Sequence, residues 1–316
     1  MSVRTRTLRV LAGAVSALAL ALSFGSASAS AAPADAKTGK SEKTGKSEKT
    51  GKSEKTGKSE KTVTSGWNNW SCRPSAAHSQ PVVLMHGTFG NSWDNWLVLA
   101  PYLVKRGYCV YSLDYGEKAG VPLFNGLGPI EKSAQQLSAF VDKVRKSTGA
   151  EKVDLVGHSQ GGGPLPRYYL NFLDGAAKVG KLVGIAPDNH GTTVSGMSRL
   201  VDTVPGARKV FSLTLPGVED QLVGSEFLKR LNSKPDTVPG VEYTVISTKY
   251  DEIATPYTSQ QLSGPDVRNV VLQDLCKFDI SEHAAIGTID RVAFHEVANA
   301  LDPAHATPTT CRSAVS

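Results

Sequence analysis

A Gly-x-Ser-x-Gly motif centred on Ser159 is the part of this sequence best suited to chemistry. Such a motif forms the sharp turn that presents a nucleophilic serine between a strand and a helix. Gly157 and Gly161 lack Cβ atoms, so the strand and the helix can approach closely. The segment 152–156, which we interpret as a short buried strand, precedes the motif, and a helix-compatible stretch, 165–173, follows it. This order makes a chance match improbable, and we predict that Ser159 is a nucleophile.

A nucleophilic serine needs a base for its proton and an acid that orients the base. For this kind of turn the chain order is serine, acid, histidine. Asp251 lies just after a predicted strand, 241–247, and is our candidate acid; Asp188, which also follows a strand, is the alternative. The neighbouring Glu252 is expected to point elsewhere. His283 follows the last predicted strand and is the candidate base.

Ester chemistry also requires hydrogen-bond donors for the oxyanion of the tetrahedral intermediate. One donor is usually the backbone N–H of the residue after the serine, here Gln160, and the second comes from the loop after the first core strand. In the loop 86–91 the backbone N–H of Thr88 is the best candidate, and its hydroxyl could add a third contact. His86 is expected to support this loop rather than to react.

Apolar segments at strand and helix spacing alternate along the chain and predict an α/β fold. We expect the α/β-hydrolase architecture: a mostly parallel sheet of about six strands with helices on both faces. The site would then lie at the carboxyl ends of the strands. The predicted strands are 82–85, 108–113, 152–156, 181–186, 241–247 and 268–273, and the predicted helices are 93–106, 129–146, 165–173 and 286–301.

The segment 191–240 interrupts this alternation, because it combines Gly, Pro and mixed helical pieces such as 219–231. It is either a cap or lid over the site or a set of ordinary scaffold helices.

The N-terminal part of the sequence indicates that the protein is exported, and we do not expect this part to belong to the folded domain. Arginines followed by an apolar run, 10–24, and by small residues are typical of a secretory signal peptide, which we assign to residues 1–31. Residues 32–66 form a basic tail with four Thr-Gly-Lys-Ser-Glu-Lys repeats at 38–61 and no apolar residue within them, so disorder is expected. The catalytic domain is assigned to residues 67–316.

The net charge of +6 does not describe the domain. Residues 1–61 carry +7, and the remainder carries −1. The domain therefore has no compositional basis for binding nucleic acid. The repeated Gly-Lys-Ser triplets do not make a phosphate-binding loop either, because five residues separate their glycines where that motif has four.

Four cysteines in an exported chain predict two disulfides. Three pairings are possible. We favour one in which each bond ties an end of the domain to a nearby core element: Cys72–Cys109 and Cys276–Cys311. Their spacing does not suit a zinc site, and no cofactor motif occurs, so we expect neither a metal nor a cofactor.

Several motifs recur in an order that resembles the secreted class 2 lipases of actinomycetes, within the α/β-hydrolase superfamily. The resemblance extends from about Trp67 to the C-terminus. It rests on His-Gly-Thr-Phe-Gly-Asn at 86–91, Leu-Asp-Tyr-Gly at 113–116, the glycine-rich turn at 157–162, Ala-Pro-Asp-Asn-His-Gly-Thr-Thr at 186–193 and Tyr-Asp-Glu at 250–252.

The resemblance implies Ser159, Asp251 and His283 as a catalytic triad, Thr88 and Gln160 as oxyanion donors, and fatty-acid esters as substrates. The sequence departs from the family at residues 163–166, Gly-Pro-Leu-Pro, where bulkier residues are expected before the second proline. That change could widen the acyl pocket or loosen the start of the helix. The Lys-rich repeat also lies outside the family pattern.

These observations predict a secreted, monomeric lipase or carboxylesterase that acts on fatty-acyl esters, with an oil–water interface as one setting. The alternatives are a polyesterase or cutinase-like hydrolase, and a catalytically silent binding module with the same fold. Apolar residues flank the predicted site, as fits a lipid substrate: Phe89, Trp93, Trp96, Val121, Leu123 and Phe124. We expect the two tryptophans among them mainly to pack against the rest of the domain.

Overall fold

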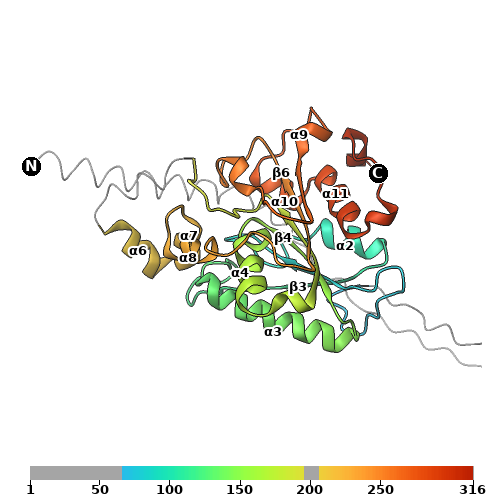
Figure 1. The fold of residues 1–316 in the computed structure, drawn as a ribbon, viewed down its shortest axis with the longest axis horizontal. Helices are drawn as coiled ribbons and strands as arrows, with labels where there is room; N and C mark the ends of the chain where they lie inside the picture. The colour runs from blue at the N-terminus through green and yellow to red at the C-terminus, as the bar shows by residue number, and fades with distance from the viewer. Residues whose placement is uncertain (1–65, 196–205, 316) are drawn as a thin grey trace, which may run out of the picture. The chain divides into compact units, whose positions relative to one another are not determined.

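Strands and helices alternate along the described chain (Figure 1). The computed structural model describes residues 66–195 and 206–315, so the predicted signal peptide and repeats lie outside it. One parallel sheet has the strand order β1-β3-β2-β4-β5-β6-β7. Its strands are β1 (Gly66–Trp67), β2 (Val82–Met85), β3 (Cys109–Leu113), β4 (Val153–His158), β5 (Val179–Ile185), β6 (Glu242–Ser247) and β7 (Val267–Val271).

The predicted α/β fold is confirmed, with seven strands instead of six. The additional strand, β1, has only two residues, too few for an apolar pattern to reveal it. Every residue of β2, β3 and β4 is buried. Parallel strands that are covered on both faces appear in a sequence as nearly continuous apolar runs. These strands could therefore be located from the sequence.

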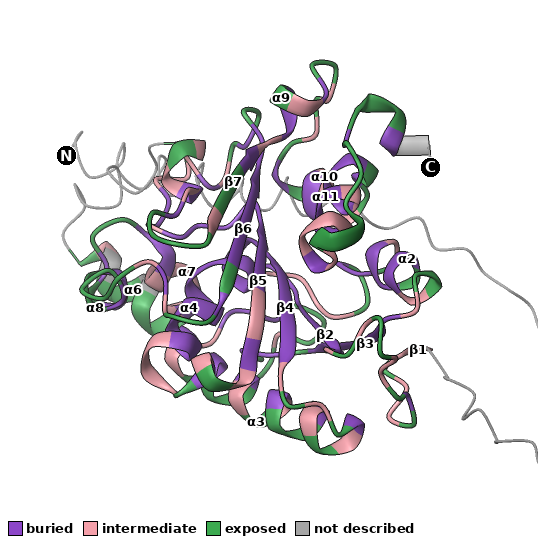
Figure 2. Cartoon of the chain, turned by 45° about the vertical axis from the view of Figure 1, so that its right-hand side comes forward, coloured by how far each residue is buried: buried purple, intermediate pink, exposed green. Residues whose placement is uncertain are grey.

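Helices cover both faces of the sheet (Figure 2). One core cluster joins α3, α4 and α8 to one face, and a second joins α2, α10 and α11 to the other. The helices are α2 (Leu99–Lys105), α3 (Ile130–Thr148), α4 (Pro164–Phe172), α6 (Ala207–Thr214), α7 (Pro216–Gln221), α8 (Glu226–Leu231), α9 (Leu272–Leu275), α10 (His283–Thr288) and α11 (Arg291–Leu301). Short 3-10 turns are η1 (Ser159–Gly162), η2 (Gly175–Lys178), η3 (Tyr257–Gln260), η4 (Pro303–His305) and η5 (Cys311–Val315).

The helix predicted from residue 93 begins only at Leu99, after a run of turns. Asn91 Oδ1 accepts hydrogen bonds from the backbone N–H groups of Trp93 and Asp94. Side chains that bond to nearby backbone in this way compete with helix formation. The prediction was wrong here because apolar spacing does not register that competition.

The predicted final helix, 286–301, is two helices. The break lies at Asp290, whose side chain accepts from the N–H groups of Val292 and Ala293 and so caps α11. His283 therefore begins α10 rather than the last long helix.

The 191–240 segment contains α6, α7 and α8. Helix α8 contributes Phe227, Leu228 and Leu231 to the core, as an ordinary scaffold helix does. Residues 196–205 lie outside the described chain, and a cap in this region stays a prediction.

Residues 163–166, where the sequence departs from the family, start α4 without loosening it. Pro164 occupies the first helical position and Pro166 the third, where backbone N–H groups have no partner within the helix. The first backbone bond of the helix is made by Arg167, whose N–H donates to Gly163.

Two disulfides close the domain ends. Cys72 is bonded to Cys109 and Cys276 to Cys311, the pairing that we favoured from the sequence. The first ties the entry segment to β3, and the second ties the C-terminal turn η5 to the segment just after α9. No helix in the described part of the chain is both long and apolar enough to cross a bilayer.

A buried ionic cluster joins four segments beside the sheet. The guanidinium of Arg167, which is fully buried, lies 2.8 Å from the carboxylate of Asp236. The same carboxylate accepts from His190 and from the backbone N–H of Ser263. Burial raises the pKa of Asp236, but these hydrogen bonds and the charge of Arg167 outweigh it and hold the pKa below its usual value.

Removing the anion from this cluster should destabilise the fold strongly. Asp236→Ala leaves Arg167 buried without its partner, and we expect a loss of about 3–5 kcal/mol in the free energy of unfolding. Urea denaturation monitored by circular dichroism measures it. The matched control is Glu226→Ala, which breaks an exposed pair with Lys229 and should cost less than about 1 kcal/mol. Equal losses in the two variants would contradict the assignment.

Candidate active site

Ser159 lies at the tip of a tight turn between β4 and α4. Its φ is 55°, in the left-handed region that non-glycine residues seldom occupy. A Cβ on Gly157 would lie 1.8 Å from the carbonyl oxygen of Gly161, and one on Gly161 would lie 2.3 Å from that of Met85. Both positions therefore require glycine. The strained φ directs the serine away from the strand, which is the geometry of a nucleophile elbow.

His283 meets Ser159 from the beginning of α10. Its Nε2 lies 3.0 Å from Ser159 Oγ, and its Nδ1 lies 2.9 Å from Asp251 Oδ2. Glu282 caps the helix through the N–H groups of Ala284 and Ala285, and so orients its first residue. The three residues chosen from sequence order thus form one hydrogen-bonded chain, Ser–His–Asp.

Asp251 is held by its own turn. Its Oδ1 accepts from the backbone N–H groups of Ile253 at 2.9 Å and Ala254 at 2.7 Å. Its Oδ2 accepts from Gln260 Nε2 at 2.8 Å. Gln260 was not predicted from the sequence, because a single buried glutamine belongs to no motif that would mark it.

Asp251 and His283 each favour the charged form of the other. Burial raises the pKa of Asp251, but the hydrogen bond and charge of His283 outweigh it and lower the pKa. Burial lowers the pKa of His283, but the same hydrogen bond raises it above 6.5. The arrangement stabilises an imidazolium against a carboxylate, as a base that accepts a serine proton requires.

The alternative acid, Asp188, is buried beside the triad but does not contact His283. Neither of its carboxylate oxygens is hydrogen-bonded to another residue of the described chain. Burial raises its pKa to about 7. Glu252, expected to point elsewhere, accepts a 3.3 Å hydrogen bond from the backbone N–H of His283. It thus contacts the histidine's backbone, whereas Asp251 contacts its ring.

The predicted oxyanion donors are backbone N–H groups of the loop after β2 and of the turn η1. Among the described residues, no acceptor is paired with the backbone N–H of Thr88. Gln160 is the second residue of η1, where backbone N–H groups lack a helical partner. The Thr88 hydroxyl contacts Gln160 Nε2 at 3.0 Å and the side-chain amide of Gln221 at about 3 Å. Gln221, from α7, was not foreseen.

His86 makes contacts that fit its expected role of supporting the loop 86–91, which we call the oxyanion loop. Its Nδ1 lies 2.8 Å from the carbonyl oxygen of Gly87, and its ring stacks on Tyr115. Burial lowers the pKa of His86 to about 4, so the ring is neutral near pH 7.

The apolar residues predicted near the site differ in exposure. Trp96 is fully buried and packs in the core, and Phe89 and Val121 are partly buried. Trp93, Leu123 and Phe124 form an exposed group. The exposed group lies on the loops that follow β2 and β3, at the same end of the sheet as Ser159.

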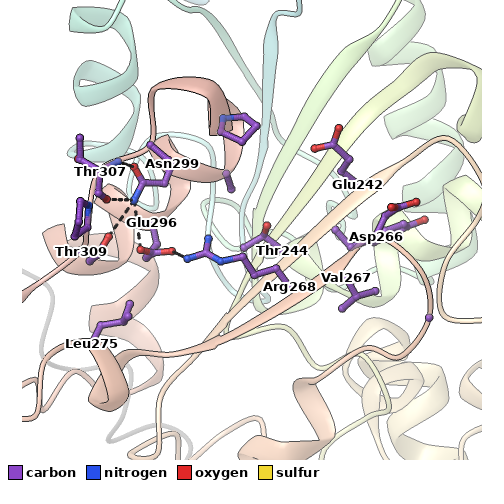
Figure 3. Close-up of a pocket in the computed structure, with 16 residues that line it drawn as sticks. Glu242, Thr244, Asp266, Val267, Arg268, Leu275, Glu296, Asn299, Thr307 and Thr309 are labelled. Atoms are coloured by element: carbon purple, nitrogen blue, oxygen red, sulfur yellow. Dashed lines mark hydrogen bonds and ion pairs between the residues drawn. The ribbon is translucent and has the colours of Figure 1, made fainter.

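The pocket of about 840 Å³ in Figure 3 is a different feature. It is lined by the first residues of β6 and β7, such as Glu242 and Val267, and crossed by the Arg268–Glu296 ion pair. Because the triad lies beyond the carboxyl ends of the strands, this pocket is not part of the site. The described residues include no group of three His, Cys, Asp or Glu side chains arranged to bind a metal.

Parts of this chain are similar to lipases in sequence. A triacylglycerol lipase of Pseudarthrobacter phenanthrenivorans is 38% identical over 92 residues, which cover 28% of this chain and 27% of the relative. One from Pseudomonas fragi is 27% identical over 126 residues, 40% of each chain. The match thus spans only about a quarter of the length of the first of these relatives.

Solved structures share the fold. Lipase B of Aspergillus fumigatus superimposes with a TM-score of 0.55 at 20% identity, over 73% of this chain and 54% of its own. The mature lipase BlEst2 of Bacillus licheniformis gives 0.50 at 16% identity, over 68% and 88%. The family model described as "Lipase (class 2)" matches residues 79–291, well over half of the chain. The chain therefore belongs to the class 2 lipase family.

Proposed function

We propose that this protein is a secreted carboxylic ester hydrolase that cleaves fatty-acid esters through an acyl-enzyme. The observation that carries the proposal is the hydrogen-bonded chain from Ser159 Oγ through His283 to Asp251. The triacylglycerol lipases among the relatives support fatty-acyl esters as the substrate class. Two disulfides and the sequence of the N-terminus support secretion.

In the proposed reaction His283 Nε2 takes the proton of Ser159, whose Oγ attacks the ester carbonyl. The backbone N–H groups of Thr88 and Gln160 hold the oxyanion, and each donor is worth ~3–4 kcal/mol. His283 then gives its proton to the leaving alcohol and activates a water that releases the fatty acid. Asp251 keeps the imidazole in the tautomer with the proton on Nδ1.

A lipid surface is the proposed setting of the reaction. Leu123 is 77% exposed and has a φ of 75°, an unfavourable conformation for a leucine. Asn91 donates to its carbonyl oxygen and so ties this loop to the oxyanion loop. Trp93 and Phe124 are exposed on the same two loops. Burying such side chains in lipid would favour docking beside the site.

Replacing the nucleophile should abolish turnover without unfolding the protein. Ser159→Ala is expected to lower kcat by at least ~10⁴-fold, because triad members act as a unit. An organophosphonate probe should label the wild-type protein at Ser159 and leave the variant unlabelled, as measured by intact-protein mass spectrometry. A folded wild-type protein that resists labelling would favour a silent binding module. Faster hydrolysis of polyester film than of emulsified triglyceride would favour a polyesterase.

The value of kcat/KM should fall as the pH is lowered, because His283 gains a proton and can no longer accept one from Ser159. Its pKa is raised above 6.5, so the acid limb of kcat/KM should lie above that pH. Asp251→Asn removes the charge that raises this pKa, and we expect the limb to move to lower pH while kcat falls by ~10⁴-fold. Rates on a soluble ester across the pH range measure both. An acid limb at the same pH in both proteins would argue against an interaction between Asp251 and His283.

Polar substitutions in the exposed loop after β3 should lower the rate of hydrolysis of aggregated substrate and leave the rate on dissolved substrate unchanged. The double variant Leu123→Asn, Phe124→Gln removes two apolar contacts worth ~1.5–3 kcal/mol each when fully buried. We expect at least a tenfold lower rate on emulsified triglyceride and an unchanged rate on a soluble short-chain ester. Asn tolerates the left-handed φ, so Tm should not fall. Equal losses on both substrates would contradict surface docking.

A further inference from the structure

Two buried polar side chains next to the triad take no part in the proton transfers and bond changes of the proposed reaction. His158 immediately precedes Ser159 and is 6% exposed, and Asn95, from the segment before α2, is 4% exposed. His158 Nε2 lies 2.9 Å from the backbone carbonyl oxygen of His283. Asn95 donates through Nδ2 to the carbonyl oxygen of Gly287, 3.2 Å away. Both side chains therefore bind α10, the helix that His283 begins.

Asn95 also binds the oxyanion loop. Its Oδ1 accepts a 2.9 Å hydrogen bond from the backbone N–H of Gly87, the residue before Thr88. One amide thus joins α10 to the loop whose Thr88 N–H is the proposed oxyanion donor. Amide groups are suited to this task because they donate and accept at once.

His158 acts as a neutral donor. Burial lowers its pKa to about 3, so the ring is uncharged at any pH at which the enzyme would work. Because the partner of Nε2 is a carbonyl oxygen, the ring proton must reside on Nε2. In that tautomer Nδ1 and Asn95 Oδ1, which lie 3.3 Å apart, are both acceptors and share no hydrogen bond.

Glycines let both neighbours close on the imidazole. A Cβ on Gly87 would lie 3.0 Å from His158 Nδ1, and a Cβ on Gly287 would lie 2.3 Å from its Cδ2. The oxyanion loop, the elbow and α10 therefore meet around one ring. Of these segments α10 is a helix of only six residues, so contacts with its neighbours should contribute much of its stability.

We propose that His158 and Asn95 are positioning residues that set His283 and the Thr88 donor relative to Ser159. This inference rests on the proposed function, because it assigns the pair to that reaction. His158 fixes the backbone of His283 from the residue adjoining the nucleophile, and Asn95 fixes the far end of α10 to the oxyanion loop. A displacement of about 1 Å at a reacting group can lower a rate ~10²-fold, which is the effect expected when the pair is lost.

The test compares two substitutions of His158. His158→Leu keeps the bulk and removes the donor, whereas His158→Gln places an amide N–H where Nε2 stands. On a soluble ester we expect His158→Leu to lower kcat by about 10²-fold at an unchanged KM, and His158→Gln to restore most of the loss. The rate of organophosphonate labelling at Ser159 should fall and recover in the same order.

A control separates positioning from general loss of stability. Asn299→Leu, on α11, removes hydrogen bonds to Thr307 and Thr309 away from the site, so it should lower Tm without lowering kcat. An unchanged kcat in His158→Leu, or equal impairment in the Leu and Gln variants, would overturn the proposal. If His158→Leu does not fold, Asn95→Leu decides: a lower kcat at constant KM supports it, and an unchanged kcat overturns it. Loss of activity in Ser159→Ala tests the hydrolase function separately, whatever these variants do.

Discussion

The close approach of β4 to the start of α4 is the constraint on which the rest of the site depends. The backbone at Gly157 passes so near Gly161 that no side chain fits at Gly157, and the backbone of Met85 and His86 leaves no room for one at Gly161. That approach forces Ser159 into the left-handed region, and a parallel sheet with helices on both faces keeps the turn in place. The sheet also brings the loops after β2, β6 and β7 to the same edge. Asp251, His283 and the proposed oxyanion donor can therefore reach one serine, although they come from distant parts of the chain.

A second layer of buried polar groups connects that site to the stability of the fold. Gln260 holds Asp251, and its backbone carbonyl oxygen accepts from Asn189. The backbone of Asn189 in turn accepts from Arg167, the cation of the buried cluster with Asp236. The orientation of the acid thus depends on segments from α4, the β5 loop and η3. Because each group is buried, an unmade bond would leave an expensive unsatisfied polar atom, and this favours a single arrangement.

Sequence reasoning worked best where one local pattern corresponds to one local structure. The buried strands, the elbow glycines and the amphipathic helix α3 were found this way. It was wrong at the start of α2 and at the break near Asp290, where side chains bond to the backbone within a few residues. It also missed β1, and it missed Gln221 and Gln260, whose roles arise from partners more than a turn away. Apolar periodicity reports burial and carries no information on such polar partners.

The sequence by itself determined the order of the chemical groups: an oxyanion loop, a serine elbow, an acid and a histidine, each after a strand. It left two acids open and placed Glu252 away from the site. Only the tertiary structure decided that Asp251 meets the ring of His283, that Asp188 is buried without contacting it, and that Glu252 contacts its backbone. The physical reason is that the parallel direction of the strands brings the loop after each strand to the same edge of the sheet. Which carboxylate then faces the imidazole depends on turn hydrogen bonds and on neighbours such as Gln260, which only the folded chain brings together.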